Sequence, residues 1–270
     1  MQTVAILMTV FNHREKALRC LETVFSQADG LSDRYTVTVY LNDDGSTDGL
    51  SEAVAGHFPS VRITRSNDLF WCRGLSRAWA EASADNPDFY LWLDFDAILH
   101  DGSLFALLDN STFLSHKAIV AGSINGPDGR LMYGGRTRGK RLMAPDPTIP
   151  VPCDMFDGNL VLVPRYVYEK LGYIDERYRQ SLGDYDYGIR AANAGITRVI
   201  APGVLADCQR RLLVPEWQDH NRTLHQRMQS LNSPKGRPYA ENFTFDLRCT
   251  GFFRAVWNAA VTTFQVLFPK

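Results

Sequence analysis

The chain has 270 residues, of which 45% are hydrophobic and 22% are charged, and its formal net charge at pH 7 is −1. These values are typical of a globular protein with one large or two small domains, and they give no overall reason to expect nucleic acid as a partner. Five cysteines without any C-x-x-C pair argue against a zinc cage and favour reduced thiols in a cytoplasmic protein.

Strand-like and helix-like patterns alternate along the first hundred residues. They predict strands at 3–9, 36–41, 61–64 and 90–93, and helices at 14–27, toward residue 57 and at 74–84. Strands and helices that alternate across short links form right-handed βαβ units on a parallel sheet. The N-terminus has no basic region or cleavage site of a signal peptide, so we expect it to form the first strand.

The rest of the chain predicts further strands and then a change of character. Strands are expected at 118–124, 160–163 and 204–206, and helices at 165–171 and from Gly183 onward. We therefore expect an α/β domain at 1–210, with a mainly parallel central sheet flanked by helices, and a helical C-terminal extension at 211–270. The segment 212–237 is polar and helical in tendency, with Pro234-Lys235-Gly236-Arg237 as a hinge.

The last helix carries an apolar stripe, formed by Phe253, Trp257, Ala260, Val261, Phe264, Leu267 and Phe268. Such a stripe packs on a domain core or forms the seam of a homodimer. Peripheral contact with a membrane surface is the weaker alternative, because the polar face carries little positive charge. No apolar run reaches the length of a membrane-spanning helix.

The most informative stretch is YLWLDFDAILHD at 90–101, where a buried strand ends in Asp94 and Asp96. Ligands of open α/β sheets bind outside the carboxyl ends of the strands. Carboxylates without nearby Cys or His suit Mg²⁺ or Mn²⁺, which also bind substrate phosphates. We therefore predict a metal-diphosphate site. In the alternative, Asp96 caps the following helix and Asp94 pairs with a local arginine.

Acidic residues also follow two other predicted strands. Asp43, in the loop after the strand at 36–41, could accept a hydrogen bond from the ring N–H of uracil or thymine, or could close an Asx-turn. A calcium-binding EF-hand is excluded there, because Ala55 occupies the required Glu position and a strand precedes the loop. Asp207 and Cys208 follow the last strand and could reach the metal region.

Two polar segments have open alternatives. The basic run RTRGKR at 136–141 is either a solvated loop or a mobile loop that closes over phosphates or an anionic acceptor. Asp157, Gly158 and Asn159 precede the strand at 160–163, and either bind sugar or acceptor hydroxyls or form a turn.

The segment GDYDYGIR at 183–190 contains a candidate general base. Asp186 and Arg190 are four residues apart and are placed to pair on one helix face. Asp184 points to a different side, so we expect Asp184 to face the crevice as the base. If Asp184 were instead the helix N-cap, the helix dipole would lower its pKa and weaken it as a base. The sequence leaves both open.

Six motifs occur in order between residues 9 and 191: TVFN at 9–12, NDDGSTDG at 42–49, LFWCRG at 69–74, LWLDFD at 91–96, DGN at 157–159 and GDYDYGIRA at 183–191. With these motifs the chain resembles the family 2 glycosyltransferases of the GT-A fold, in the bacterial branch that builds surface polysaccharide. The resemblance covers 3–208, and the ordered combination is far more specific than any single motif.

The resemblance implies an inverting glycosyltransferase that moves a sugar from a UDP- or dTDP-sugar to a hydroxyl of a glycan or lipid-linked acceptor. It implies a divalent cation, Mn²⁺ or Mg²⁺, and a cytoplasmic location, at the inner face of the cell membrane if the last helix binds lipid. The implied residues are, for the nucleotide, Thr9, Phe11, Asn12, Asp43, Asn67, Trp71, Arg73 and Asp94; for the metal, Asp94, Asp96 and Asp207; for acceptor or sugar, Asp157, Gly158 and Asn159; for catalysis, Asp184 and Asp186.

Two departures from the family pattern put the metal ligands in doubt. Many relatives have a His after the last strand, where this chain has Asp207-Cys208. Phe95, between the two metal-motif acids, is often acidic or small in relatives, which makes Asp96 the safer ligand of that pair. The rival functions are a glycoside hydrolase with paired carboxylates, which would need neither Asp43 nor a metal, and a non-catalytic sugar-nucleotide-binding protein. A nucleotidyltransferase would also use a metal and phosphates, but this chain has no Gly-rich phosphate loop after its first strand.

Overall fold

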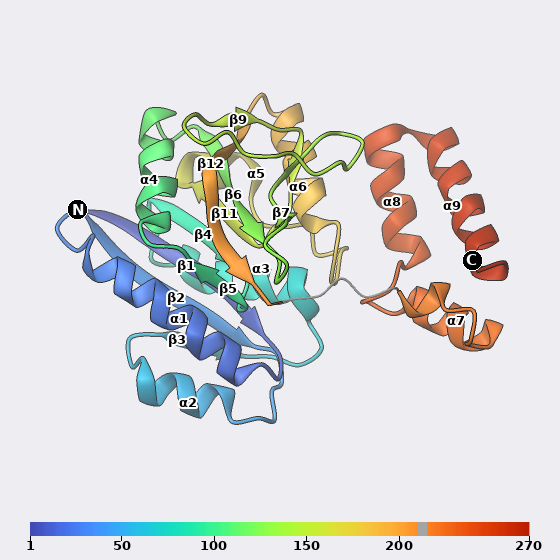
Figure 1. Cartoon of the computed structure of the whole chain (residues 1–270), viewed down its shortest axis with the longest axis horizontal. Coiled ribbons are helices and arrows are strands. Elements are labelled where there is room, and N and C mark those ends of the chain that lie inside the picture. The colour runs from blue at the N-terminus through green and yellow to red at the C-terminus, as the bar shows by residue number, and fades with distance from the viewer. Residues whose placement is uncertain (210–214, 270) are drawn as a thin grey trace.

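The structure is a computed structural model that describes residues 1–209 and 215–269 (Figure 1). The strands are β1 (Gln2–Val10), β2 (Tyr35–Asp43), β3 (Arg62–Arg65), β4 (Phe89–Leu93), β5 (Ala97–Leu99), β6 (Ala118–Asn125), β7 (Leu131–Tyr133), β8 (Gly135–Arg136), β9 (Val151–Pro152), β10 (Met155–Phe156), β11 (Leu160–Pro164) and β12 (Thr197–Cys208). The α-helices are α1 (Arg14–Asp29), α2 (Leu50–His57), α3 (Phe70–Ser83), α4 (Ser103–Phe113), α5 (Arg165–Leu171), α6 (Gly183–Asn193), α7 (Leu224–Asn232), α8 (Tyr239–Thr250) and α9 (Phe252–Leu267).

The main sheet has the order β3-β2-β1-β4-β11-β6-β12-β5. β1 pairs in parallel with β2 and β4, β2 with β3, and β6 with β12, whereas β11 runs antiparallel to β4 and β6. The expected mainly parallel sheet is confirmed. The predicted strand at 90–93 is β4, and its position beside β1 and β11 places the end of this strand at the centre of the sheet.

Helices cover both faces of the sheet because side chains alternate along the strands. In β1, Val4, Ile6 and Met8 pack with residues of α1, α2 and α4, whereas Ala5 and Leu7 pack on the other side with residues of α3, α5 and α6. These two apolar layers fix the strand ends rigidly, so residues that follow β1, β2 and β4 are held next to one another.

Two elements differ from their predicted bounds. α3 begins at Phe70 rather than at residue 74, because the Asp44 carboxylate accepts hydrogen bonds from the backbone N–H groups of Leu69 and Phe70 and so holds the first turn. β12 begins at Thr197 rather than at 204, and its pairing with β6 shifts register between Ile200 and Val204. The irregular register interrupts the local pattern by which a strand is found in a sequence.

The C-terminal helices α7, α8 and α9 lie at one side of the sheet domain (Figure 1). α8 contacts that domain directly, since Glu241 forms an ion pair with Arg179 over 2.7 Å and Phe245 packs in the core layer of Tyr178. The predicted boundary of the extension at residue 211 falls outside the described residues. In the described part of the chain, no helix is long and apolar enough to cross a membrane.

The apolar stripe predicted for the last helix lies on α9, but most of its large side chains face outward. Phe253 is 88% exposed and Trp257 is 63% exposed, and Phe264 and Phe268 are also exposed. Ala255, Thr262 and Val266 form the buried side of the helix instead. Within the described structure, the stripe is therefore a surface and not part of the core.

Candidate active site

Two adjoining pockets lie where β1, β2 and β4 end. The first pocket holds about 700 Å³ of empty space and the second about 650 Å³, and both are open to solvent. Trp71, Asp94 and Gln180 line both pockets and so form the boundary between them. Both pockets lie near the carboxyl ends of parallel strands, where ligands of open α/β sheets bind.

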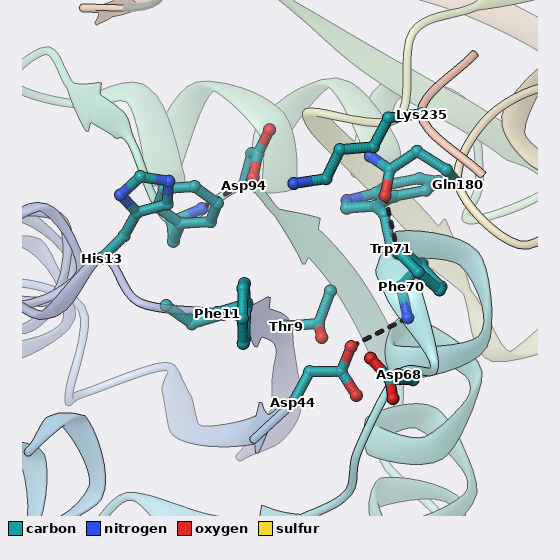
Figure 2. A pocket seen from close by; sticks show the side chains of 12 residues that line it. Thr9, Phe11, His13, Asp44, Asp68, Phe70, Trp71, Asp94, Gln180 and Lys235 are labelled. Carbon is teal, nitrogen blue, oxygen red and sulfur yellow. Dashed lines mark hydrogen bonds between the residues drawn. The ribbon is translucent and has the colours of Figure 1, made fainter. Parts of the chain in front are cut away.

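Four of the residues predicted to bind nucleotide line the first pocket: Thr9, Phe11, Trp71 and Asp94. Figure 2 shows Thr9 and Phe11 entering from the end of β1, with Trp71 on the opposite wall at the start of α3. Phe11 is 47% exposed, so its ring is available for stacking on a flat ligand.

Asp43 and Asp44 are placed differently from the prediction for this loop. Asp43 accepts hydrogen bonds from the backbone N–H of Ser46 (2.8 Å) and the hydroxyl of Ser51 (2.5 Å), so its carboxylate closes its own loop. The neighbouring Asp44 is held as well, by the Ser66 hydroxyl (2.8 Å) and by the backbone N–H groups of Leu69 and Phe70, but Asp44 lines the first pocket (Figure 2) and Asp43 does not. The geometry therefore favours Asp44, and not Asp43, as the acid that faces a bound ligand.

The other three residues predicted to bind nucleotide hold the surrounding loops. Asn12 Oδ1 accepts a hydrogen bond of 2.7 Å from the backbone N–H of Thr47, which ties the end of β1 to the loop after β2. Asn67 packs against Gly45 in the same loop. Arg73 donates a hydrogen bond of 2.8 Å to the carbonyl oxygen of Glu176. Each of them therefore shapes the pocket indirectly.

The acids predicted to bind metal are spread over three places. Asp94 lies between the two pockets, where its Oδ2 accepts a hydrogen bond of 2.7 Å from the Asn159 side chain. Asp96 lines a separate small hollow and lies 3.8 Å from the ammonium of Lys16. Among the described residues, no group of three or more His, Cys, Asp and Glu side chains is arranged to hold a metal.

Asp207 does not join these acids. Its carboxylate lies 3.0 Å from Nε2 of His100 and is 58% exposed, because Asp207 points outward from β12 while its strand neighbour Cys208 points inward. Asp94, which faces both pockets, fits a Mg²⁺ or Mn²⁺ ion as a single protein ligand, since these ions commonly use one or two carboxylates and take their remaining ligands from water and substrate phosphates. The described structure does not bring Asp96 to the same place.

The residues predicted to bind sugar or acceptor line the second pocket, together with Asp184. The Nε–H of Arg136 donates to both carboxylate oxygens of Asp157, at 2.7 and 2.9 Å, and the Tyr185 hydroxyl donates a further hydrogen bond of 2.9 Å. Arg136 belongs to the basic run at 136–141, so at least this member of the run is fixed against the site. With its oxygens so occupied, Asp157 shapes the wall of the pocket.

Asp184 is the carboxylate best suited to accept a proton. It lies in the first turn of α6, where its oxygens accept hydrogen bonds of 2.9 Å from the backbone N–H groups of Tyr185 and Gly158. Burial, followed by the negative charge of Asp157, raises the pKa of Asp184 to about 7, although those backbone N–H groups act in the opposite direction. A carboxylate with a pKa near neutrality is well matched to general-base catalysis.

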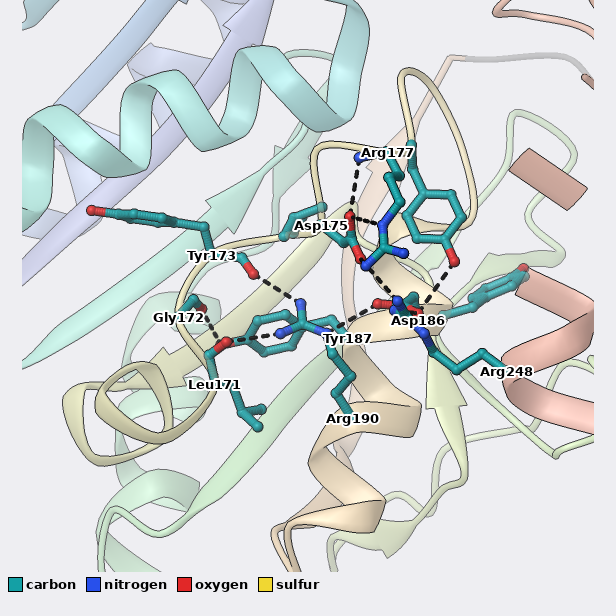
Figure 3. A network of polar contacts seen from close by, with 12 residues as sticks. Leu171, Gly172, Tyr173, Asp175, Arg177, Asp186, Tyr187, Arg190 and Arg248 are labelled. Atoms are coloured by element: carbon teal, nitrogen blue, oxygen red, sulfur yellow. Dashed lines mark hydrogen bonds and ion pairs between the residues drawn. The ribbon is translucent and has the colours of Figure 1, made fainter. Parts of the chain in front are cut away.

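Asp186 is fully buried and serves the structure (Figure 3). The predicted pair with Arg190 is confirmed, with 3.0 Å between Nε and Oδ2. Asp186 also pairs with Arg248 from α8 and accepts a hydrogen bond from the Tyr178 hydroxyl. A carboxylate with three such partners and no exposed surface cannot reach a substrate, so of the two predicted catalytic acids the geometry favours Asp184.

Several pocket residues were not identified from the sequence. Asp68, Phe70, Gln180 and Lys235 line the first pocket, and Tyr185 lines the second. Asp68 and Phe70 have positive φ angles of 56° and 62°, which side-chain-bearing residues rarely adopt. Such backbone strain is frequent at ligand sites and could not be read from local patterns.

A model of the family described as Glycosyl transferase family 2 matches residues 5–172. The chain is also similar to an N-acetylglucosaminyl-diphospho-decaprenol L-rhamnosyltransferase of Mycobacterium tuberculosis (strain ATCC 25618 / H37Rv). The two are 26% identical over 230 residues, which cover 74% of this chain and 72% of that protein.

Solved structures share the fold. A crystal structure of GalNAc-T7 with UDP, GalNAc and Mn²⁺ aligns with a TM-score of 0.60 and 13% identity, covering 89% of this chain and 50% of that one, so this chain spans about half of its length. A crystal structure of S. aureus TarS 1-349 aligns with a TM-score of 0.58 and 13% identity, covering 99% of this chain and 81% of that one. The expected GT-A fold is confirmed, and with the family model spanning residues 5–172 the chain belongs to glycosyl transferase family 2.

Proposed function

We propose that this glycosyltransferase is an inverting enzyme that transfers a sugar from a pyrimidine nucleotide diphosphate to a hydroxyl of a glycan or lipid-linked acceptor. The observation that carries the proposal is the relation between the two pockets. Asp94 lies at their boundary and Asp184 lines the second one, so a leaving diphosphate in the first pocket and an attacking hydroxyl in the second would meet between them.

The nucleotide is assigned to the first pocket. The ring of Phe11 offers a stacking surface, and Asp44 offers a carboxylate to the ring N–H that uracil and thymine both carry. Asp44 also accepts hydrogen bonds from Leu69 and Phe70 at 2.9 and 2.8 Å, which fix its direction before any ligand arrives. This pre-organisation lowers the entropy that binding has to overcome.

In the transfer step, Asp184 accepts the proton of the acceptor hydroxyl as the oxygen forms its bond to the anomeric carbon. The bond between that carbon and the diphosphate oxygen breaks, and its electron pair leaves with the nucleotide diphosphate. Attack from the second pocket and departure into the first occur on opposite faces of the sugar, which inverts the anomeric centre. A divalent cation held by Asp94, with Asp96 as the predicted second ligand, would supply positive charge to the leaving diphosphate.

The acceptor is proposed to be lipid-linked, and the reaction to belong to bacterial cell-wall or surface-polysaccharide synthesis. The mycobacterial relative is named for an acceptor that is linked to decaprenol. The outward-facing Phe253, Trp257, Phe264 and Phe268 on α9 fit a peripheral contact with the membrane that carries such a lipid. Sedimentation with lipid vesicles tests this contact, and a dimer that buries the same side chains would contradict it.

A screen of UDP-, dTDP- and GDP-sugars with Mn²⁺ tests the proposed function. Binding of one sugar nucleotide raises the melting temperature by mass action, and that sugar nucleotide is then used in a transfer assay. We expect stabilisation by a uridine or thymidine diphosphate sugar and formation of a glycoside with inverted configuration. A protein that hydrolyses glycosides without any nucleotide would instead support the glycoside hydrolase, and binding without turnover would support a non-catalytic protein.

A further inference from the structure

Lys235 comes from the C-terminal extension, yet it lines the first pocket. It lies in the turn between α7 and α8, and it is the single lysine or arginine among the described residues that line this pocket. Figure 2 shows its side chain extended across the pocket, with the amine end directed toward the side where Asp94 lies. In the described part of the chain, its ammonium makes no hydrogen bond or ion pair with another residue.

The turn that carries Lys235 is fixed by its backbone. A Cβ on Gly236 would lie 2.0 Å from the carbonyl oxygen of Ser230 and 2.7 Å from that of Leu231, so only glycine permits this close approach. The Arg237 N–H donates a hydrogen bond of 2.8 Å to the Leu231 carbonyl, and the Leu231 side chain is fully buried beside Trp217. Lys235 is therefore presented by a closed turn and not by an open loop.

The extension as a whole is held on the sheet domain by charged contacts. Glu241 of α8 pairs with Arg179, which lies beside the pocket residue Gln180, and Arg248 of α8 pairs with Asp186 of α6. These contacts link α8, which follows the turn at Lys235, to the residues on either side of the segment 180–185, which helps to line the second pocket. The tertiary structure thus sets the position of the backbone that carries Lys235, although Lys235 lies 63 residues beyond the end of the family match at residue 172.

The first pocket combines this ammonium with several carboxylates. Asp44, Asp68 and Asp94 line the pocket, so an incoming nucleotide diphosphate would meet three carboxylates unless cations are present. We propose that Lys235 binds the diphosphate of the sugar nucleotide and stabilises the negative charge of the departing nucleotide diphosphate. This inference rests on the proposed function. It makes the C-terminal extension part of the nucleotide site and not merely an appendage to it.

Binding of nucleotides that differ in phosphate number tests the proposal directly. Calorimetry with Mn²⁺ compares the wild type, Lys235→Gln and Lys235→Arg for UDP or dTDP, whichever binds the wild type, and for the matching nucleoside. Lys235→Gln should lower the affinity for the nucleoside diphosphate by about tenfold or more, since a charge-assisted hydrogen bond is lost. The affinity for the nucleoside should stay unchanged. Lys235→Arg should keep most of the affinity. Higher salt should reduce the difference in diphosphate affinity between the wild type and Lys235→Gln.

Two further variants separate this role from a structural one. Lys117→Gln removes another exposed lysine, whose ammonium lies 5.9 Å from the Tyr166 ring and which lines neither pocket, and this variant should bind nucleotide like the wild type. Gly236→Val should displace the turn and lower the affinity for the nucleoside diphosphate, although Lys235 is still present. The inference would be overturned if wild type and Lys235→Gln bound the nucleoside diphosphate with equal affinity. It would also be overturned if Lys235→Gln lost as much affinity for the nucleoside as for the diphosphate. If the wild type bound no nucleotide at all, the proposed function itself would fail.

Discussion

The backbone N–H of Gly158 donates a hydrogen bond of 2.9 Å to Oδ2 of Asp184. This bond joins the segment before β11 to the first turn of α6. A Cβ on Gly158 would lie 2.2 Å from the Trp71 ring. Glycine at this position therefore lets Trp71, which lies between the two pockets, come close to the segment that holds Asp184. One hydrogen bond thereby connects the proposed general base to the boundary between the two pockets.

Asp184→Asn should lower kcat/KM about 100-fold or more, because an amide cannot accept the proton of the acceptor hydroxyl. In the wild type, the pKa of Asp184 is about 7, so kcat/KM should rise with pH below that value and level off above it as the carboxylate ionises. The variant should lack this rise. Transfer rates measured from pH 5 to 9 provide the test, with the exposed Asp33→Asn as a matched control that keeps the wild-type profile.

The stability of the same variant gives an independent check on that pKa. Because the pKa of Asp184 is raised from 3.8 to about 7, the folded protein holds more protons than the unfolded chain between these values, and the contribution of Asp184 to stability decreases as pH rises through this range. The free energy of unfolding of Asp184→Asn relative to wild type should therefore increase from pH 5 to pH 8. If the difference in free energy of unfolding between the variant and the wild type did not change with pH, the pKa of Asp184 would be that of an ordinary aspartate.

Asp186→Asn should destabilise the fold by about 3 kcal/mol, because removal of a buried carboxylate leaves the charges of Arg190 and Arg248 uncompensated. Urea denaturation measures the change. Glu52→Gln, which removes the exposed partner of Arg65, should change the free energy of unfolding by less than about 1 kcal/mol. Loss of transfer in Asp186→Asn without any loss of stability would contradict the structural role and restore Asp186 as a catalytic candidate.

Asp44→Asn should weaken binding of the pyrimidine nucleotide about tenfold, since the carboxylate that faces the pocket is exchanged for an amide. Asp43→Asn should have a smaller effect on affinity and instead disturb the loop that its bonds to Ser46 and Ser51 close. Calorimetry with the nucleoside alone is the sharper measurement, because it excludes the contribution of the phosphates. If Asp43→Asn proved the more damaging of the two, the sequence-based assignment to Asp43 would stand.

Chelation by EDTA should abolish transfer, and Mn²⁺ or Mg²⁺ should restore it. Asp94→Asn should raise the cation concentration needed for half-maximal activity, because its carboxylate lines the pocket that we propose for the diphosphate. Asp96→Asn should also impair transfer and leave the fold intact, whereas Asp207→Asn should not, since Asp207 pairs with the exposed His100. Full activity in EDTA would refute the metal requirement. An Asp207 variant that needed more cation would reinstate Asp207 as a ligand.

The sequence by itself determined the α/β fold, because runs of buried residues and amphipathic helices are local patterns set by the periods of strand and helix. It also placed acids at the strand ends and identified the pair of Asp186 and Arg190, which depends only on helical spacing.

Only the tertiary structure decided which polar groups face the pockets. Asp44 rather than Asp43 is turned inward because the start of α3 supplies its partners, and Asp207 is directed outward by the alternation of β12. Lys235 reaches the site from a segment more than 130 residues beyond Asp94, through the docking of α8. Such placements depend on contacts between distant segments, and no local pattern of residues encodes them.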